Sequence, residues 1–139
     1  MTAQTPAIDA LQQALTSEYE AVYAYGFLGA RYPDERDGAA LDSYRLHRKR
    51  RNATIALIEG LGAQPVGAAA VVDLPDVTSA KQAAALGRTI ERRCLARWTG
   101  VIGVTSNGTR AFAVTMMGDT AVSALTWGVR PIALPGLAR

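Results

Sequence analysis

Residues 62–77 divide the chain into two halves of helical character. This stretch contains Pro65, Gly67 and Pro75, a composition that disfavours a continuous helix. About 16 residues span roughly 50 Å when extended, at about 3.3 Å each, whereas a helix of about 24 residues is about 36 Å long. The connector can therefore run the full length of a helical bundle and make the helices on its two sides parallel.

Four other stretches carry helical signals, and their ends are marked by residues that stop or start helices. Pro33 ends the first, Gly62 follows the second, Thr78 is the predicted N-cap of the third, and a turn over 105–108 precedes the fourth. We predict helices over about 5–31, 38–61, 78–104 and 109–128. Connections in the order short, long, short predict an all-α, ferritin-like antiparallel four-helix bundle with one long crossover connection between the second and third helices.

The composition agrees with one helical domain over residues 1–139. Apolar residues make up 49% of the chain but aromatic residues only 6%, which suits closely packed helices. The single Cys94 excludes an intrachain disulfide and predicts a cytoplasmic protein. Residues 111–129 are rather apolar, but Asp119 and two glycines favour a buried helix, so we expect no membrane span.

The first predicted helix carries a carboxylate on its apolar face. At 100° per residue, Glu18 falls within the arc formed by Leu11, Leu15, Val22 and Tyr25. Burying an unpaired charge is costly, so Glu18 needs a buried partner. Its position predicts a polar site inside the bundle.

The second helix offers such partners at heptad-like spacing, while Arg48, Lys49 and Arg50 are expected to face elsewhere. We predict that Glu18 pairs with Arg51 or His47, with hydrogen bonds from Tyr25 and Tyr44. In the third helix Cys94 lies on an apolar face and is interpreted as a small hydrophobe. The seam of the second helix is Tyr44, His47, Arg51, Thr54, Ile58 and Leu61, and the predicted buried polar layer is Glu18, Tyr25, Tyr44, His47, Arg51 and Glu91.

Basic residues cluster around His47, at Arg45, Arg48, Lys49 and Arg50, within a net charge of +3. Such a run can bind nucleic acid or another polyanion, with steeply salt-dependent affinity. It lacks interleaved aromatic residues or a reading-helix motif. We therefore expect a solvated helix face and no nucleic-acid partner.

The fourth predicted helix has two apolar faces. A helix that is apolar on both sides is buried on both sides or packs against a second subunit. This pattern predicts a homodimer formed through the fourth helix. One face carries Val114, Met117, Ala121 and Leu125, and the other carries Phe112, Met116, Ser123 and Trp127.

Three segments, 18–26 (Glu-Tyr-Glu-Ala-Val-Tyr-Ala-Tyr-Gly), 47–51 (His-Arg-Lys-Arg-Arg) and 134–137 (Leu-Pro-Gly-Leu), resemble an alanine-rich ferritin-like family of unknown function found in actinobacteria. The resemblance extends over essentially the whole chain. It implies membership of the ferritin-like four-helix bundle superfamily and raises the question of a metal centre.

A di-iron bundle needs a Glu from each of two helices and a Glu-x-x-His from each of the other two. The chain offers Glu18, His47, Glu91 and Asp119, with Tyr44 and Cys94 where an acid and a histidine are needed. The arginines Arg51, Arg93 and Arg97 would oppose a dication. We therefore predict a non-catalytic protein with a degenerate di-iron site, no metal and a structural or protein-interaction role. The alternative is a redox or storage protein that binds iron or manganese through Glu18, His47 and Glu91.

Overall fold

The computed structural model describes residues 5–31 and 38–133, and these contain four long helices, one short 3-10 helix and no strand. The prediction of an all-α four-helix bundle is confirmed at this level. The predicted helix stop at Pro33 and the 134–137 motif lie outside the described residues. The elements are α1 (Pro6–Arg31), α2 (Ala39–Gly60), α3 (Ala80–Val104), α4 (Asn107–Ala124) and η1 (Leu125–Trp127).

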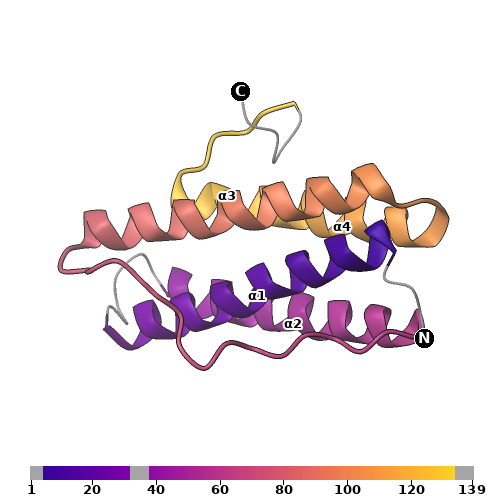
Figure 1. Ribbon diagram of the computed structural model, residues 1–139. Helices are drawn as coiled ribbons and strands as arrows, with labels where there is room; N and C mark the ends of the chain where they lie inside the picture. The colour runs from indigo at the N-terminus through magenta and orange to yellow at the C-terminus, as the bar shows by residue number, and fades with distance from the viewer. Residues whose placement is uncertain (1–4, 32–37, 134–139) are drawn as a thin grey trace.

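The connector between α2 and α3 runs back along the length of the helices before α3 begins (Figure 1). Helix α1 packs against α2 and α3, while α4 packs chiefly against α3. The side chain of Val77 is buried near the end of the connector. Nε of Arg31 in α1 donates a hydrogen bond to the backbone carbonyl of Val77 at 3.0 Å. The first half of the chain is thereby fixed to the start of α3.

The N-cap of helix α3 lies one residue later than the sequence predicts. Ser79 is its N-cap, and its hydroxyl accepts a hydrogen bond from the amide of Gln82 at 3.2 Å. The Gln82 side chain in turn accepts from the amide and hydroxyl of Thr78, at 2.7 and 2.9 Å. This arrangement resembles a capping box, except that Gln82 accepts from Thr78 and not from the N-cap Ser79. Thr78, the predicted N-cap, therefore contributes to the cap from the position before it.

Two clusters of buried apolar side chains form the core. One contains Tyr25, Leu28, Ile90 and Trp127 among others, and the second contains Leu11, Leu15, Ile58, Trp98 and Val101 among others. Glu18 lies on α1 between the segments that contribute to the two clusters. Its surroundings therefore form a polar layer at the junction of two apolar regions.

The buried face of α2 contains Arg50 where the sequence predicted Arg51. Ser43, His47, Arg50, Thr54 and Ile58 are buried at spacings of three and four residues, which is one helical face. Arg51 is rotated by about 100° from Arg50, lies half-buried at the edge, and donates to Asn52 Oδ1 at 3.0 Å. Both spacings are compatible with helical periodicity, so tertiary packing decides between the two arginines. Leu61, the predicted end of the seam, is exposed.

Helix α4 is unusually exposed for so apolar a sequence. Only Ala113, Thr120 and Ala124 of its 18 residues are buried, all of them small. Val114 and Val122 of α4 are 47% and 69% exposed, and Leu125 at the start of η1 is 50% exposed. Among the helices of the described residues, none is both long and apolar enough to cross a membrane.

Candidate functional site

A histidine between two carboxylates forms the centre of the buried polar layer. His47 of α2 lies with Nδ1 2.5 Å from Glu18 Oε2 of α1 and with Nε2 2.9 Å from Glu91 Oε1 of α3. All three side chains are fully buried. Three helices therefore meet through one imidazole ring, which we call the Glu18–His47–Glu91 clasp.

Two aromatic side chains also donate hydrogen bonds to the clasp. Trp98 donates from its indole nitrogen to Glu18 Oε1 at 3.0 Å, and Tyr25 donates from its hydroxyl to Glu91 Oε1 at 2.7 Å. Phe112 packs edge-on against Trp98 with ring centroids 5.8 Å apart. Both carboxylates are thus oriented by donors from α1 or α3 as well as by His47.

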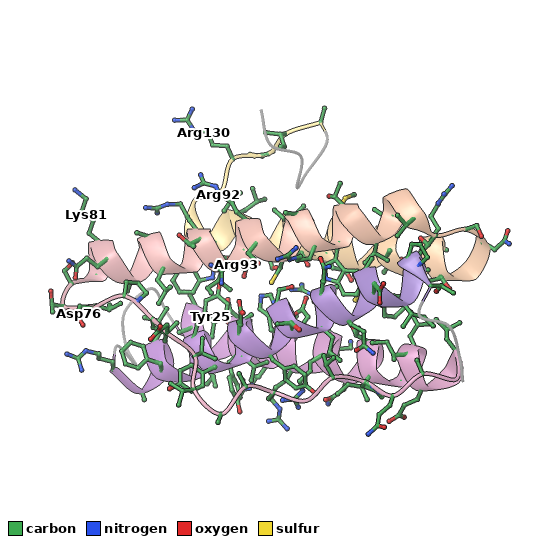
Figure 2. The ribbon with its side chains drawn as sticks, viewed as in Figure 1. Tyr25, Asp76, Lys81, Arg92, Arg93 and Arg130 are labelled. Carbon is green, nitrogen blue, oxygen red and sulfur yellow. The ribbon has the colours of Figure 1, made fainter. Side chains whose placement is uncertain are left out.

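Tyr25 also stacks on the histidine ring. Its centroid lies 5.4 Å from that of His47 and 5.2 Å from that of Trp127, so the three rings form a column. Figure 2 shows Tyr25 in the space between α1 and α3. An aromatic face at this distance favours a cationic ring.

The surroundings of His47 favour its protonated form. Burial is the largest single influence and lowers its pKa. The charge of Glu18, together with hydrogen bonds involving Cys94, Glu18 and Glu91, outweighs burial and raises the pKa well above 6.5. Because both ring nitrogens face carboxylate oxygens, an imidazolium that donates from both nitrogens satisfies the geometry.

Cys94 lies beside the clasp and is fully buried. Its Sγ donates to the backbone carbonyl of Ser17 at 3.7 Å. Burial, followed by the charge of Glu18, raises the pKa of the thiol from 9.0 to about 11, although His47 acts in the opposite direction. The thiol is therefore protonated near neutral pH and is a poor nucleophile as it stands.

The structure brings together four of the six residues predicted for the polar layer: Glu18, Tyr25, His47 and Glu91. Tyr44 is half-buried, and its ring lies under the guanidinium of Arg48 at 5.7 Å. The pair of Glu18 with Arg51 is not formed. The guanidinium of Arg51 is directed to Asn52, and His47 takes the place of the cation next to Glu18.

The predicted polar layer did not include Cys94 or Trp98. Cys94 was interpreted as a small hydrophobe on the apolar face of the third helix, and both side chains are buried. The signal that could have found them is their spacing from Glu91. Positions 91, 94 and 98 are separated by three and four residues, so they share one helical face.

Two buried polar atoms among the described residues have no hydrogen-bond partner: Glu91 Oε2 and Arg50 Nη1. The other terminal nitrogen of Arg50 donates to Ser123 Oγ of α4 at 3.2 Å. Arg50 lies one turn beyond His47 on the buried face of α2. The buried guanidinium of Arg50 thus bonds to a neutral hydroxyl. The buried carboxylates Glu18 and Glu91 bond to His47 instead.

The donor set does not fit a di-iron centre. Glu18 and Glu91 lie at opposite nitrogens of His47, and the directions of these two nitrogens diverge. A single ion bound at Nδ1 would be out of reach of the Glu91 oxygen that faces Nε2. Helix α4 brings Ser123 and Thr120 to its inner side, neither of which is a carboxylate or histidine. The geometry therefore gives little support to an iron or manganese site made of Glu18, His47 and Glu91.

The fold and the site define an all-helical bundle with a buried carboxylate–histidine–carboxylate clasp. The chain belongs to the family described as Domain of unknown function (DUF4439), whose model matches residues 10–139. A search of curated protein sequences finds no match.

Among solved structures, the chain is similar to the crystal structure of a conserved hypothetical protein, rv2844, from Mycobacterium tuberculosis. The two chains are 30% identical and superpose with a TM-score of 0.83, over 92% of this chain and 98% of the other. The arrangement of helices is therefore shared with a protein from a mycobacterium.

Proposed function

We propose that this protein is a single-domain, ferritin-like helical bundle without catalytic activity, whose role is structural or in protein interaction. The observation that carries the proposal is that both nitrogens of His47 are bonded to carboxylates from two other helices. The hydrogen bonds of the clasp would then connect the helices in place of a metal centre. We also propose a cytoplasmic location, because a chain with the single cysteine Cys94 forms no intrachain disulfide.

The clasp is suited to fixing how the helices align. A buried ion pair contributes little net stability against a well-packed apolar alternative, because desolvation offsets the attraction between the charges. Each bond of the clasp nevertheless requires a particular register between α2 and its neighbours. Sliding α2 by one residue would remove His47 from both carboxylates.

The outer face of α4 is the proposed surface of interaction, and a second copy of the chain is its proposed partner. Support comes from a stripe at spacings of three and four residues that is apolar or small throughout and continues from α4 into η1: Ala111, Val114, Gly118, Val122 and Leu125. Such a seam is self-complementary across a two-fold axis.

Sedimentation tests this surface with two matched substitutions. Val122→Glu adds a charge to the centre of the stripe and is expected to give a monomer where the unaltered protein is a dimer. Val71→Glu is the control, because Val71 is 74% exposed in the connector, away from α4. A clean monomer of the unaltered protein at micromolar concentration would remove the homodimer from the proposal.

The second candidate function is a redox or storage protein that binds iron or manganese. The observation in its favour is Glu91 Oε2, a buried carboxylate oxygen without a partner beside other acidic and imidazole groups. Elemental analysis after growth with added iron or manganese tests it. Stoichiometric metal that is lost in Glu18→Ala would support this function, and substoichiometric metal unchanged by the substitution would exclude it.

A further inference from the structure

The clasp uses Glu18, His47 and Glu91 but leaves Cys94 without a role. One ligand atom from each of Glu18, His47 and Cys94 lies within 4.8 Å of the other two, and all three residues are fully buried. A carboxylate oxygen, an imidazole nitrogen and a sulfur are all ligand types that zinc binds in proteins. They come from α1, α2 and α3, so the bundle itself brings them together.

We propose that Glu18, His47 and Cys94 bind one divalent cation of the zinc type, an ion with affinity for thiolates. With bonds of about 2.0–2.3 Å, neighbouring ligand atoms of a tetrahedral zinc ion are roughly 3.3–3.8 Å apart. The separation of Glu18 Oε2 and His47 Nδ1 would widen from 2.5 Å by about one ångström. Cys94 Sγ starts no more than 4.8 Å from the other two ligand atoms and would approach to the same range.

His47 Nδ1 is the nitrogen assigned to the metal, because it faces Glu18. The opposite nitrogen then keeps its proton and donates it to Glu91 Oε1, now at 2.9 Å. Metal-binding histidines commonly donate their second N–H to a carboxylate in this way. Trp98 meanwhile holds the other oxygen of Glu18, so the partners that orient the ligands are already in position.

The exchange of protons for metal leaves the buried charge unchanged. Without metal, an imidazolium, two carboxylates and a neutral thiol sum to −1. With metal, the ion adds +2, while His47 loses one proton and Cys94 loses another, so the sum is again −1. The two protons leave to solvent, and bonds from the metal to oxygen, nitrogen and sulfur form in their place. Burial that opposes a free thiolate therefore does not oppose a thiolate bound to a cation.

The thiol also limits the choice of ion. Thiolate and imidazole ligands suit zinc, whereas magnesium, calcium and manganese prefer sites made of oxygen ligands. The inference is thus distinct from an iron or manganese store. It does not depend on association through α4, and its failure would leave the hydrogen-bonded clasp as described.

Cobalt is the probe, because a thiolate bound to Co²⁺ gives a charge-transfer band in the near ultraviolet. The full chain, reduced with a phosphine and stripped of metal, is titrated with Co²⁺ and then with Zn²⁺. We expect one Co²⁺ per chain, a charge-transfer band, its loss as Zn²⁺ displaces cobalt, and release of about two protons per ion near neutral pH. The chain has a single cysteine and a single histidine, so the band reports Cys94, and the proton spectrum of the histidine reports His47.

Three variants assign the ligands. Cys94→Ser is expected to lose the band. Glu91→Gln is expected to keep the band and to weaken binding by about 10–100-fold, as for other partners of ligating histidines. Glu20→Gln is the control from the same helix as Glu18, because Glu20 pairs with Arg93 at 2.7 Å at the surface. It is expected to bind like the unaltered chain.

Absence of the band in the unaltered chain would overturn the proposal even if Cys94→Ser failed to fold. Binding without a shift of the His47 resonance would also overturn it. So would zinc affinity that is equal in the folded Cys94→Ser variant and in the unaltered chain.

Discussion

Removing His47 leaves two buried carboxylates without the cation between them. We expect His47→Leu to lower the free energy of unfolding by about 3–5 kcal/mol, the range for breaking a buried ion pair by removing one partner. Denaturant unfolding measures the change. Glu20→Gln is the control, since it breaks the exposed pair with Arg93 and should cost less than about 1 kcal/mol. Equal losses in the two variants would contradict the central role of His47.

The proton of His47 makes stability depend on pH. Its pKa in the folded protein is raised well above 6.5, so its contribution is fully present below the unfolded value of about 6.5. The contribution is lost as pH rises toward the folded pKa, because the unfolded chain then binds fewer protons than the folded one. We therefore expect stability to fall as pH rises from about 6.5 to about 7.5 and to fall less in His47→Leu.

Proton NMR measures the pKa of His47 directly, because His47 is the only histidine in the chain. Its ring resonance should remain that of an imidazolium at pH 7.5 in the folded protein. Below about pH 7.5 the buried Cys94 contributes little to the slope, since its thiol is still protonated in both the folded and the unfolded chain. A titration midpoint near 6.5 would show that the carboxylates do not hold the proton.

At this scale, periodicity predicted part of the site. Glu18 was identified because a carboxylate occupied an apolar arc, which is a local property of α1. Its partners could not be deduced with the same certainty, since His47 and Trp98 are 29 and 80 residues away in the chain. Arg50 and Arg51 differ by one residue on a continuous helix, and only packing against Ser123 of α4 shows which one is buried.

Among the elements, α3 and η1 approach each other so closely that one position requires glycine. A Cβ at Gly87 would lie 2.4 Å from ring atoms of Trp127, which is held by stacking on Tyr25 and by a 2.9 Å hydrogen bond to Ser43. Gly87 also provides a carbonyl that accepts from the Tyr25 hydroxyl at 3.3 Å. The glycine thus permits the aromatic column to reach the clasp.

Two glycine-to-alanine substitutions in α3 distinguish the effect of a clash with Trp127 from the effect of a higher helix propensity. Gly87→Ala is expected to destabilise the protein by about 1–3 kcal/mol through overpacking. Gly100→Ala is the control on the same helix, where a Cβ meets nothing within 4 Å, and it should stabilise the protein by up to about 1 kcal/mol. Thermal unfolding followed by circular dichroism measures both changes. The same sign in both variants would contradict the packing of Trp127.

The presence of four helices was the more predictable feature, but their ends were less so, since α4 begins at Asn107 within the predicted turn and ends at Ala124. For α4, the pattern indicated two apolar faces but could not tell which face is covered. The structure covers only its small residues Ala113, Thr120 and Ala124. Exposure of Val122 and Leu125 depends on how far α4 lies from the rest of the bundle, which is a tertiary property.

For the whole molecule, the connector determines which helices are neighbours, and its route depends on a few attachments. At its beginning, the side chain of Gln12 in α1 donates to the Gln64 carbonyl at 2.8 Å and accepts from the Val66 amide at 2.9 Å. At its end, Val77 is buried and Leu74 packs against the core. The side chain of Gln12 therefore holds the first residues of the connector against α1 through two backbone hydrogen bonds.

Loss of this glutamine is expected to loosen the connector locally. Two hydrogen bonds at an exposed site contribute about 1 kcal/mol together, since water replaces them. Gln12→Ala should therefore speed hydrogen exchange of the Val66 amide by about fivefold and lower global stability by no more than about 1 kcal/mol. Gln13→Ala is the control, because Gln13 also lies exposed on α1 but accepts from Arg97 of α3 at 2.9 Å. NMR exchange rates distinguish the two variants, and equal rates at Val66 would mean that Gln12 does not hold the connector against α1.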